Sequence, residues 1–170
     1  GDLTEISFMD SLFNGKIKLD WGNNNSFDLP DTVIHFAEQP SAPFSMIDSE
    51  KSNFTLINNV ISTNNLINSI KKFNIKAHII KLGTMGEYGT PNIDIEEGWL
   101  NVEHNNRKQK FLYPRQASSI YHTSKIMDTD LLWFAVRTWK IKVTDLMQGP
   151  VYGIFTKQTE LNENLSTIFN

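Results

Sequence analysis

Short apolar, β-branched runs alternate along this chain with long stretches of helical spacing, and this alternation restricts the fold more than any other feature. The runs at residues 32–37, 77–82 and 141–146 indicate buried strands. Residues 48–73 and 118–140 carry apolar side chains mostly three or four positions apart, which is typical of helices. The alternation predicts an α/β domain with a parallel sheet that is covered on both faces and joined by right-handed crossovers.

Two smaller elements complete the expected fold. A short helix is predicted at residues 5–14. Within the long connection that follows the second strand, residues 99–103 and 110–113 can pair as a hairpin across Asn105-Asn106. Ligands of parallel sheets bind beyond the carboxyl ends of the strands. We therefore expect a site where the three predicted strands end, at residues 37–41, 83–87 and 148–152.

Composition excludes several classes of function. A chain of 170 residues with 39% hydrophobic and 21% charged residues suits one globular domain. A net charge of −3 gives no basic surface, so nucleic acid is not an expected partner. No apolar run is long enough to span a membrane, so a membrane is not an expected partner. Cysteine is absent and the four histidines lack metal-ligand spacing, so no metal site is predicted.

Tyr121 and Lys125 are four positions apart in a predicted helix and therefore lie on one face of it. An ammonium beside a phenol favours the phenolate and lowers its pKa. A hydroxyl from Thr84, at the end of the preceding strand, can reach the same point. Such a group could take a proton from a sugar or alcohol hydroxyl. The spacing alone is equally compatible with a solvated surface pair.

Three glycines, Gly83, Gly86 and Gly89, follow the second strand in the spacing of a dinucleotide fingerprint. That fingerprint requires a helix whose N-terminal amides meet a pyrophosphate. The residues after Gly89 are loop-like and acidic, so no helix is expected there. The glycines are instead predicted to form a tight loop that approaches a ligand closely.

Several segments resemble a known family. The stretch KLGTMGEYGTPNIDIEEG (81–98) is a specific signature, supported by HFAEQ (35–39) and the YHTSK run at 121–125. The chain is similar to the extended short-chain dehydrogenase/reductases and, among them, to the UDP-sulfoquinovose synthase family. The resemblance implies a partial, Rossmann-like, doubly wound sheet. Residues 1–153 would form part of an NAD-binding domain, and 154–170 would begin the substrate domain. The first βαβ unit with its glycine-rich loop, and most of the C-terminal domain, would be missing.

The resemblance also implies roles for individual residues. Thr84, Tyr121 and Lys125 would be the catalytic triad, and Asn59 the structural asparagine of the superfamily. NAD would be the cofactor. The residues implied to contact it are Asp2, Ala37, Glu38, Gln39, Tyr121, Lys125, Gln148 and Val151.

Some positions depart from related enzymes. Relatives that dehydrate a sugar at C6 carry an Asp-Glu pair directly after the triad threonine, and this chain has Met85 and Gly86 there. Acid–base chemistry at C5 and C6 would then come from another group, and Glu87 and His122 are the nearest candidates. Two further departures, Pro40 in place of arginine and Met147 in place of asparagine, leave the substrate less certain than the reaction class.

The implied reaction converts UDP-glucose and sulfite to UDP-sulfoquinovose through a 4-keto intermediate. By the resemblance, the full-length enzyme is expected to be a homodimer, either in a bacterial cytoplasm or in the plastid stroma of a plant or alga. Two alternatives stay open at this stage. One is an NAD-dependent sugar-nucleotide 4-epimerase or dehydratase, and the other is an inactive, truncated fragment.

Overall fold

The computed structural model describes residues 1–14, 29–95 and 98–149. Three parallel strands form its sheet in the order β1-β2-β5: β1 (Thr32–His35), β2 (His78–Thr84) and β5 (Lys142–Gln148). The parallel arrangement predicted from the sequence is therefore confirmed. In the register of β2 and β5, Lys81 pairs with Asp145 and Thr84 pairs with Gln148.

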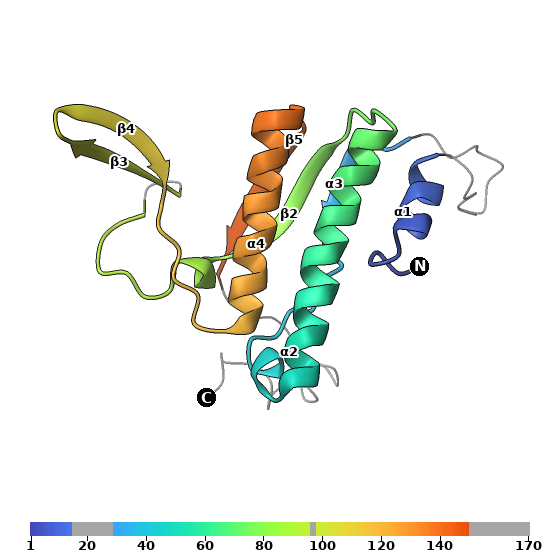
Figure 1. The fold of residues 1–170 in the computed structure, drawn as a ribbon, viewed down its shortest axis with the longest axis horizontal. Helices are drawn as coiled ribbons and strands as arrows, with labels where there is room; N and C mark the ends of the chain where they lie inside the picture. The colour runs from blue at the N-terminus through green and yellow to red at the C-terminus, as the bar shows by residue number, and fades with distance from the viewer. Residues whose placement is uncertain (15–28, 96–97, 150–170) are drawn as a thin grey trace.

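Helices separate the strands in the expected order (Figure 1). The α-helices are α1 (Ile6–Phe13), α2 (Ser49–Leu56), α3 (Ser62–Lys72) and α4 (Ile120–Phe134). Two five-residue π-helical segments continue them, η2 (Ile57–Ile61) between α2 and α3 and η4 (Ala135–Trp139) after α4. Two short 3-10 turns, η1 (Phe44–Met46) and η3 (Met85–Tyr88), follow β1 and β2. The long predicted helices are thus present, with π-helical segments that apolar spacing did not reveal.

The predicted hairpin is confirmed. Strands β3 (Trp99–His104) and β4 (Arg107–Leu112) pair antiparallel around Asn105 and Asn106. Both asparagines have positive φ, 49° and 60°, as a two-residue hairpin turn requires. The hairpin extends away from the sheet (Figure 1).

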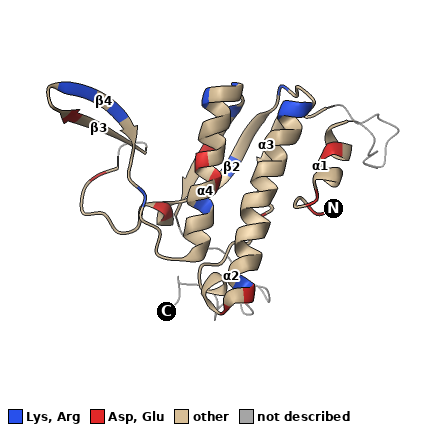
Figure 2. Ribbon diagram, in the orientation of Figure 1, with Lys and Arg blue, Asp and Glu red and all other residues tan. Residues whose placement is uncertain are grey.

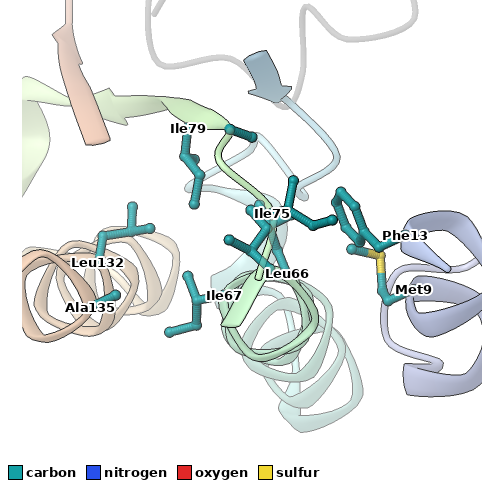
Figure 3. Close-up of a cluster of buried hydrophobic side chains, with 10 residues drawn as sticks. Met9, Phe13, Leu66, Ile67, Ile75, Ile79, Leu132 and Ala135 are labelled. Atoms are coloured by element: carbon teal, nitrogen blue, oxygen red, sulfur yellow. The ribbon is translucent and has the colours of Figure 1, made fainter. Parts of the chain in front are cut away.

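The hydrophobic core lies between α1, α3, α4 and one face of the sheet (Figure 3). Ile79 of β2 is fully buried there, as is Leu132 of α4. Side chains on the opposite face are less covered: Ile34 is 61% exposed and Leu146 is 45% exposed. Within the described ranges the expected cover on both faces is therefore present on one face only.

Candidate active site

Thr84 is the last residue of β2, where a parallel sheet places its ligands. Its Oγ1 accepts a hydrogen bond from the backbone nitrogen of Gly86 at 3.1 Å and caps the turn η3. This turn is the only helical structure that follows Gly83 in the part described before residue 96. No α-helix opens at the three glycines there, as the sequence predicted.

The start of α4 brings the tyrosine and the lysine to the same end of the sheet. Ser119 is the N-cap, and its Oγ accepts from the backbone nitrogen of His122 at 3.1 Å. The backbone nitrogen of Tyr121 donates to Ser45 Oγ at 3.0 Å, which fixes the first turn of α4 against η1. Tyr121 is half-buried and Lys125 is buried one turn later.

Within the described part of the chain, the Lys125 ammonium donates to two acceptors. One is the backbone oxygen of Leu82 in β2, at 2.5 Å, and the other is the carboxylate of Glu38. Burial lowers the pKa of Lys125 from 10.5 to about 8. The ammonium is thus directed at the sheet and at the segment after β1.

The expected lowering of the Tyr121 pKa is not found in this structure. Burial raises the pKa of the phenol, and the negative charges of Glu87 and Asp128 act in the same direction. The prediction assumed that four-residue spacing would bring the ammonium to the phenol. Spacing places Tyr121 and Lys125 on one helix face, but the lysine side chain is long enough to contact the carboxylate of Glu38 instead.

His122 is half-buried beside Tyr121, with ring centroids 5.1 Å apart. Its Nδ1 lies 3.0 Å from Ser119 Oγ. A Cβ added at Gly86 would collide with the imidazole, chiefly at Nε2. The ring therefore fills the space that a side chain at position 86 would occupy. Burial lowers the pKa of His122, which favours the neutral ring.

Glu87 is fully buried, so it is not a solvated loop carboxylate. Thr129 Oγ1 lies 3.1 Å from its Oε2, Lys81 Nζ lies 3.6 Å from its Oε1, and Arg115 Nε lies 3.4 Å from its Oε2. Burial raises the pKa of Glu87 from 4.5 to about 7, while Lys81 and Arg115 oppose the shift. All of these partners are internal side chains. Its role as an acid or base stays a prediction.

Lys81 was missed by sequence reasoning. It is fully buried in the middle of β2, where its Nζ donates to the backbone oxygen of Lys125 at 3.1 Å and to Thr129 Oγ1 at 3.0 Å. Asp145, its register partner on β5, has Oδ2 at 3.7 Å from Nζ. Charged segments of β2 and α4 meet in the centre of the molecule (Figure 2). A lysine inside an apolar strand run was the available signal, since a buried charge needs a partner.

Four of the residues implied to contact a cofactor, Asp2, Ala37, Glu38 and Gln39, line one cleft of about 670 Å³, together with Pro40. Tyr121, Lys125 and Gln148 are not among the residues that line it. The carboxylate of Asp2 accepts from Thr4 Oγ1 at 2.7 Å and from the backbone nitrogen of Thr4 at 2.8 Å, and these contacts lower the pKa of Asp2. The tertiary structure thus joins the N-terminal residues to the loop after β1.

Asn59 is fully buried below this loop. Its Oδ1 accepts from the backbone nitrogen of Gln39 at 2.7 Å, and its Nδ2 donates to Ser124 Oγ at 3.0 Å. One side chain therefore ties the loop after β1 to α4, which fits the structural role that the resemblance implies. His35, on β1, is buried with Nε2 3.0 Å from Thr63 Oγ1.

Gln148 ends β5 next to Thr84 in the register, so it lies at the same edge. Val151 and the segment 154–170 lie outside the described residues. Met147 is not among the residues that line the cleft of Asp2 and Glu38. It lines a second, mostly apolar cavity of about 630 Å³ between α4, β5 and the hairpin.

Within the described residues, no group of three or more histidine, aspartate or glutamate side chains could hold a metal ion. In that same part of the chain, none of the helices is both long and apolar enough to cross a membrane.

Comparison with known proteins identifies relatives. The profile of the NAD dependent epimerase/dehydratase family matches residues 17–170. UDP-sulfoquinovose synthase, chloroplastic, from Spinacia oleracea is 47% identical over all 170 residues, which cover 33% of that protein. UDP-sulfoquinovose synthase from Sulfolobus acidocaldarius is 46% identical over 142 residues, 83% of this chain and 36% of that one. The chain thus spans about a third of the length of these curated relatives.

Solved structures share the fold. UDP-glucose 4-epimerase from Thermotoga maritima, solved with UDP-glucose, superposes with a TM-score of 0.65 at 20% identity, over 90% of this chain and 41% of that one. UDP-glucose 4-epimerase from Thermus thermophilus, solved with NAD, gives a TM-score of 0.63 at 19% identity, over 90% and 40%. These similarities confirm a partial Rossmann-like fold.

Proposed function

Because the chain belongs to the NAD dependent epimerase/dehydratase family, we propose that it is the catalytic part of an enzyme that converts UDP-glucose and sulfite to UDP-sulfoquinovose with NAD. One structural observation carries the site. The Lys125 ammonium contacts Glu38, which lines the cleft, and this contact supports a single site for the catalytic helix and the cofactor. The two relatives named UDP-sulfoquinovose synthase support the choice of reaction.

The cleft fits a dinucleotide cofactor. Glu38 Oε1 is buried without a hydrogen-bond partner in the part of the chain described, although the neutral His35 ring lies 3.3 Å away. A ribose hydroxyl would satisfy such an oxygen. Asp2, which lines the same cleft, presents a second carboxylate. Ala37 and Gln39 would contact the cofactor from the loop after β1, and Gln148 would contact it from the end of β5.

In the proposed reaction, Tyr121 removes the proton of the C4 hydroxyl, assisted by Lys125 and positioned with Thr84. NAD, which Asp2, Glu38 and Gln39 would hold in the cleft, would supply the hydride chemistry: removal of the C4 hydrogen with its electron pair and its later return. The ketone at C4 acidifies the C5 proton, so water can leave from C6. Sulfite then adds to C6 of the resulting alkene.

Two side chains remain candidates for the acid–base chemistry at C5 and C6. His122 is the better placed, because its ring fills the space beside Gly86 in the turn after Thr84. Burial raises the pKa of Glu87 to about 7, which suits proton transfer. Its contacts in the described structure, however, are with the side chains of Thr129, Lys81 and Arg115. Position therefore favours His122 as the group beside C6, without making it the base at C5.

The test uses the full-length protein that contains this chain, supplied with UDP-glucose, NAD and sulfite. We expect a sulfonated sugar nucleotide by mass spectrometry, formed only when all three are present. Formation of UDP-galactose, with or without sulfite, would identify a 4-epimerase instead. Recovery of unchanged substrate would reject both reactions. The homodimer and the compartment stay predictions. The word chloroplastic in the name of the spinach relative concerns the compartment and not the homodimer.

A further inference from the structure

Ser119 makes two contacts with His122, one with its backbone nitrogen and one with its ring. As the N-cap of α4, Ser119 Oγ accepts from the backbone nitrogen of His122 at 3.1 Å. The same Oγ lies 3.0 Å from Nδ1 of the ring. A hydroxyl has one proton to donate, and the capping contact does not use it.

Two physical effects favour donation from Ser119 Oγ to Nδ1 of His122. An oxygen that already accepts a hydrogen bond becomes a stronger donor, because linked hydrogen bonds polarise one another. The free N–H groups at the start of a helix also create a positive potential, which favours a lone pair facing them and opposes an imidazolium. Burial of His122 acts in the same direction. The single proton of the neutral ring then resides on Nε2.

Gly86 determines what Nε2 faces. A Cβ at this position would overlap Nε2, Cδ2 and Cε1 of His122, so only glycine leaves room for the ring. The backbone nitrogen of Gly86 donates to Thr84 Oγ1 at 3.1 Å. Nε2 of His122 consequently lies against the turn that carries Thr84, at the carboxyl end of β2.

We propose that Ser119 is a positioning residue that holds His122 as a neutral hydrogen-bond donor, with Nε2–H directed at a sugar oxygen beside Thr84. This inference rests on the proposed function, because it takes the ligand to be a sugar. An N–H in this place stabilises negative charge that develops on the oxygen. It has no lone pair free to accept the C5 proton, so His122 binds and polarises the substrate, and another group serves as the base at C5.

The experiment measures the tautomer directly in the full-length protein, by long-range nitrogen–proton correlation NMR with ¹⁵N-labelled histidine. A His122→Gln variant identifies the signal by its loss. Two variants at position 119 both cap the helix. Ser119→Thr keeps the hydroxyl proton, whereas Ser119→Asp offers only acceptor oxygens.

We expect the Nε2–H form in the parent and in Ser119→Thr. In Ser119→Asp we expect the proton on Nδ1 and a pKa of His122 raised by about 1 to 3, as for a ring that gains a carboxylate neighbour. A parent protein with the proton on Nδ1 would overturn the proposal, and so would a tautomer that is the same in Ser119→Asp.

A second measurement separates donor from base. With UDP-glucose and NAD in deuterated water, His122→Ala should still exchange the C5 hydrogen of the sugar, because a donor is not needed for that step. Loss of exchange in His122→Ala would identify His122 as the base and reject its assignment as a donor. A parent that shows Nε2–H but makes no sulfonated product would refute the proposed function and leave the Ser119 assignment intact.

Discussion

The ammonium of Lys125 donates to the carboxylate of Glu38, which lies 87 positions earlier in the chain. This contact joins the middle of α4 to the loop that follows β1 and lines the cofactor cleft. It also directs the lysine charge toward Glu38, while burial raises the pKa of Tyr121. Activation of the phenol therefore depends on what Lys125 is paired with.

Replacing Glu38 by glutamine should lower the pKa of Tyr121 in the cofactor-free protein. The change removes a negative charge and frees the ammonium to approach the phenol. The measurement is ultraviolet titration of the phenolate, with Glu38→Gln/Tyr121→Phe subtracted to isolate Tyr121. Glu103→Gln is the matched control, because Glu103 pairs with Lys108 at 3.3 Å on the exposed hairpin. An equal shift in both single variants would show that Glu38 has no specific effect.

Tyr121→Phe should slow oxidation at C4 by about 10²–10⁴-fold in the full-length enzyme, the usual contribution of a general base. Phenylalanine keeps the ring and its packing, so the midpoint of thermal unfolding should change little. Stopped-flow absorbance of reduced cofactor measures the step. A loss below tenfold would mean that Tyr121 is not the base.

Lys125→Met should move the pH–rate profile of the same step to higher pH. In the reacting complex the ammonium would favour the phenolate electrostatically once it is released from Glu38, and methionine retains the side-chain length without the charge. The profile should be measured at saturating cofactor, so that weaker cofactor binding does not disguise the shift. An unchanged pH–rate profile would show that Lys125 does not affect the ionisation of Tyr121.

Glu87 should make the folded protein less stable as the pH rises from about 4.5 to about 7, because burial raises its pKa across that interval. Within this window the folded state holds the proton that the unfolded state has already released, so the free energy of unfolding falls as the pH rises. Glu87→Gln cannot ionise and should flatten this part of the curve, as measured by urea denaturation. A slope unchanged by the substitution would contradict a raised pKa.

His122→Ala should accumulate the 4-keto sugar and reduced cofactor while forming little sulfonated product. The imidazole packs against Gly86 in the turn after Thr84, so its loss should affect the chemistry at C6 more than oxidation at C4. Gly86→Ala is a useful companion, because a methyl group there displaces the same ring and leaves the histidine in the sequence. Product formation at the parent rate in both variants would exclude a role for His122.

The sequence by itself determined the elements that depend on local pattern. The alternation of apolar runs and helical spacing predicted the parallel sheet, and Asn105-Asn106 predicted the hairpin, because each follows from neighbouring residues. The placement of Tyr121 and Lys125 on one helix is equally local. The two π-helical segments could not be predicted from local pattern, because they leave the apolar spacing almost unchanged.

Only the tertiary structure decided how the charged side chains are paired. Glu38 and Lys125 meet because β1 and α4 pack at the same end of the sheet, and Lys81 and Glu87 are buried because α4 covers them. Burial and distant partners set the pKa of each group, and neither can be read from sequence spacing. The order of residues therefore predicted which side chains would carry the chemistry, and packing determined which partners those side chains contact.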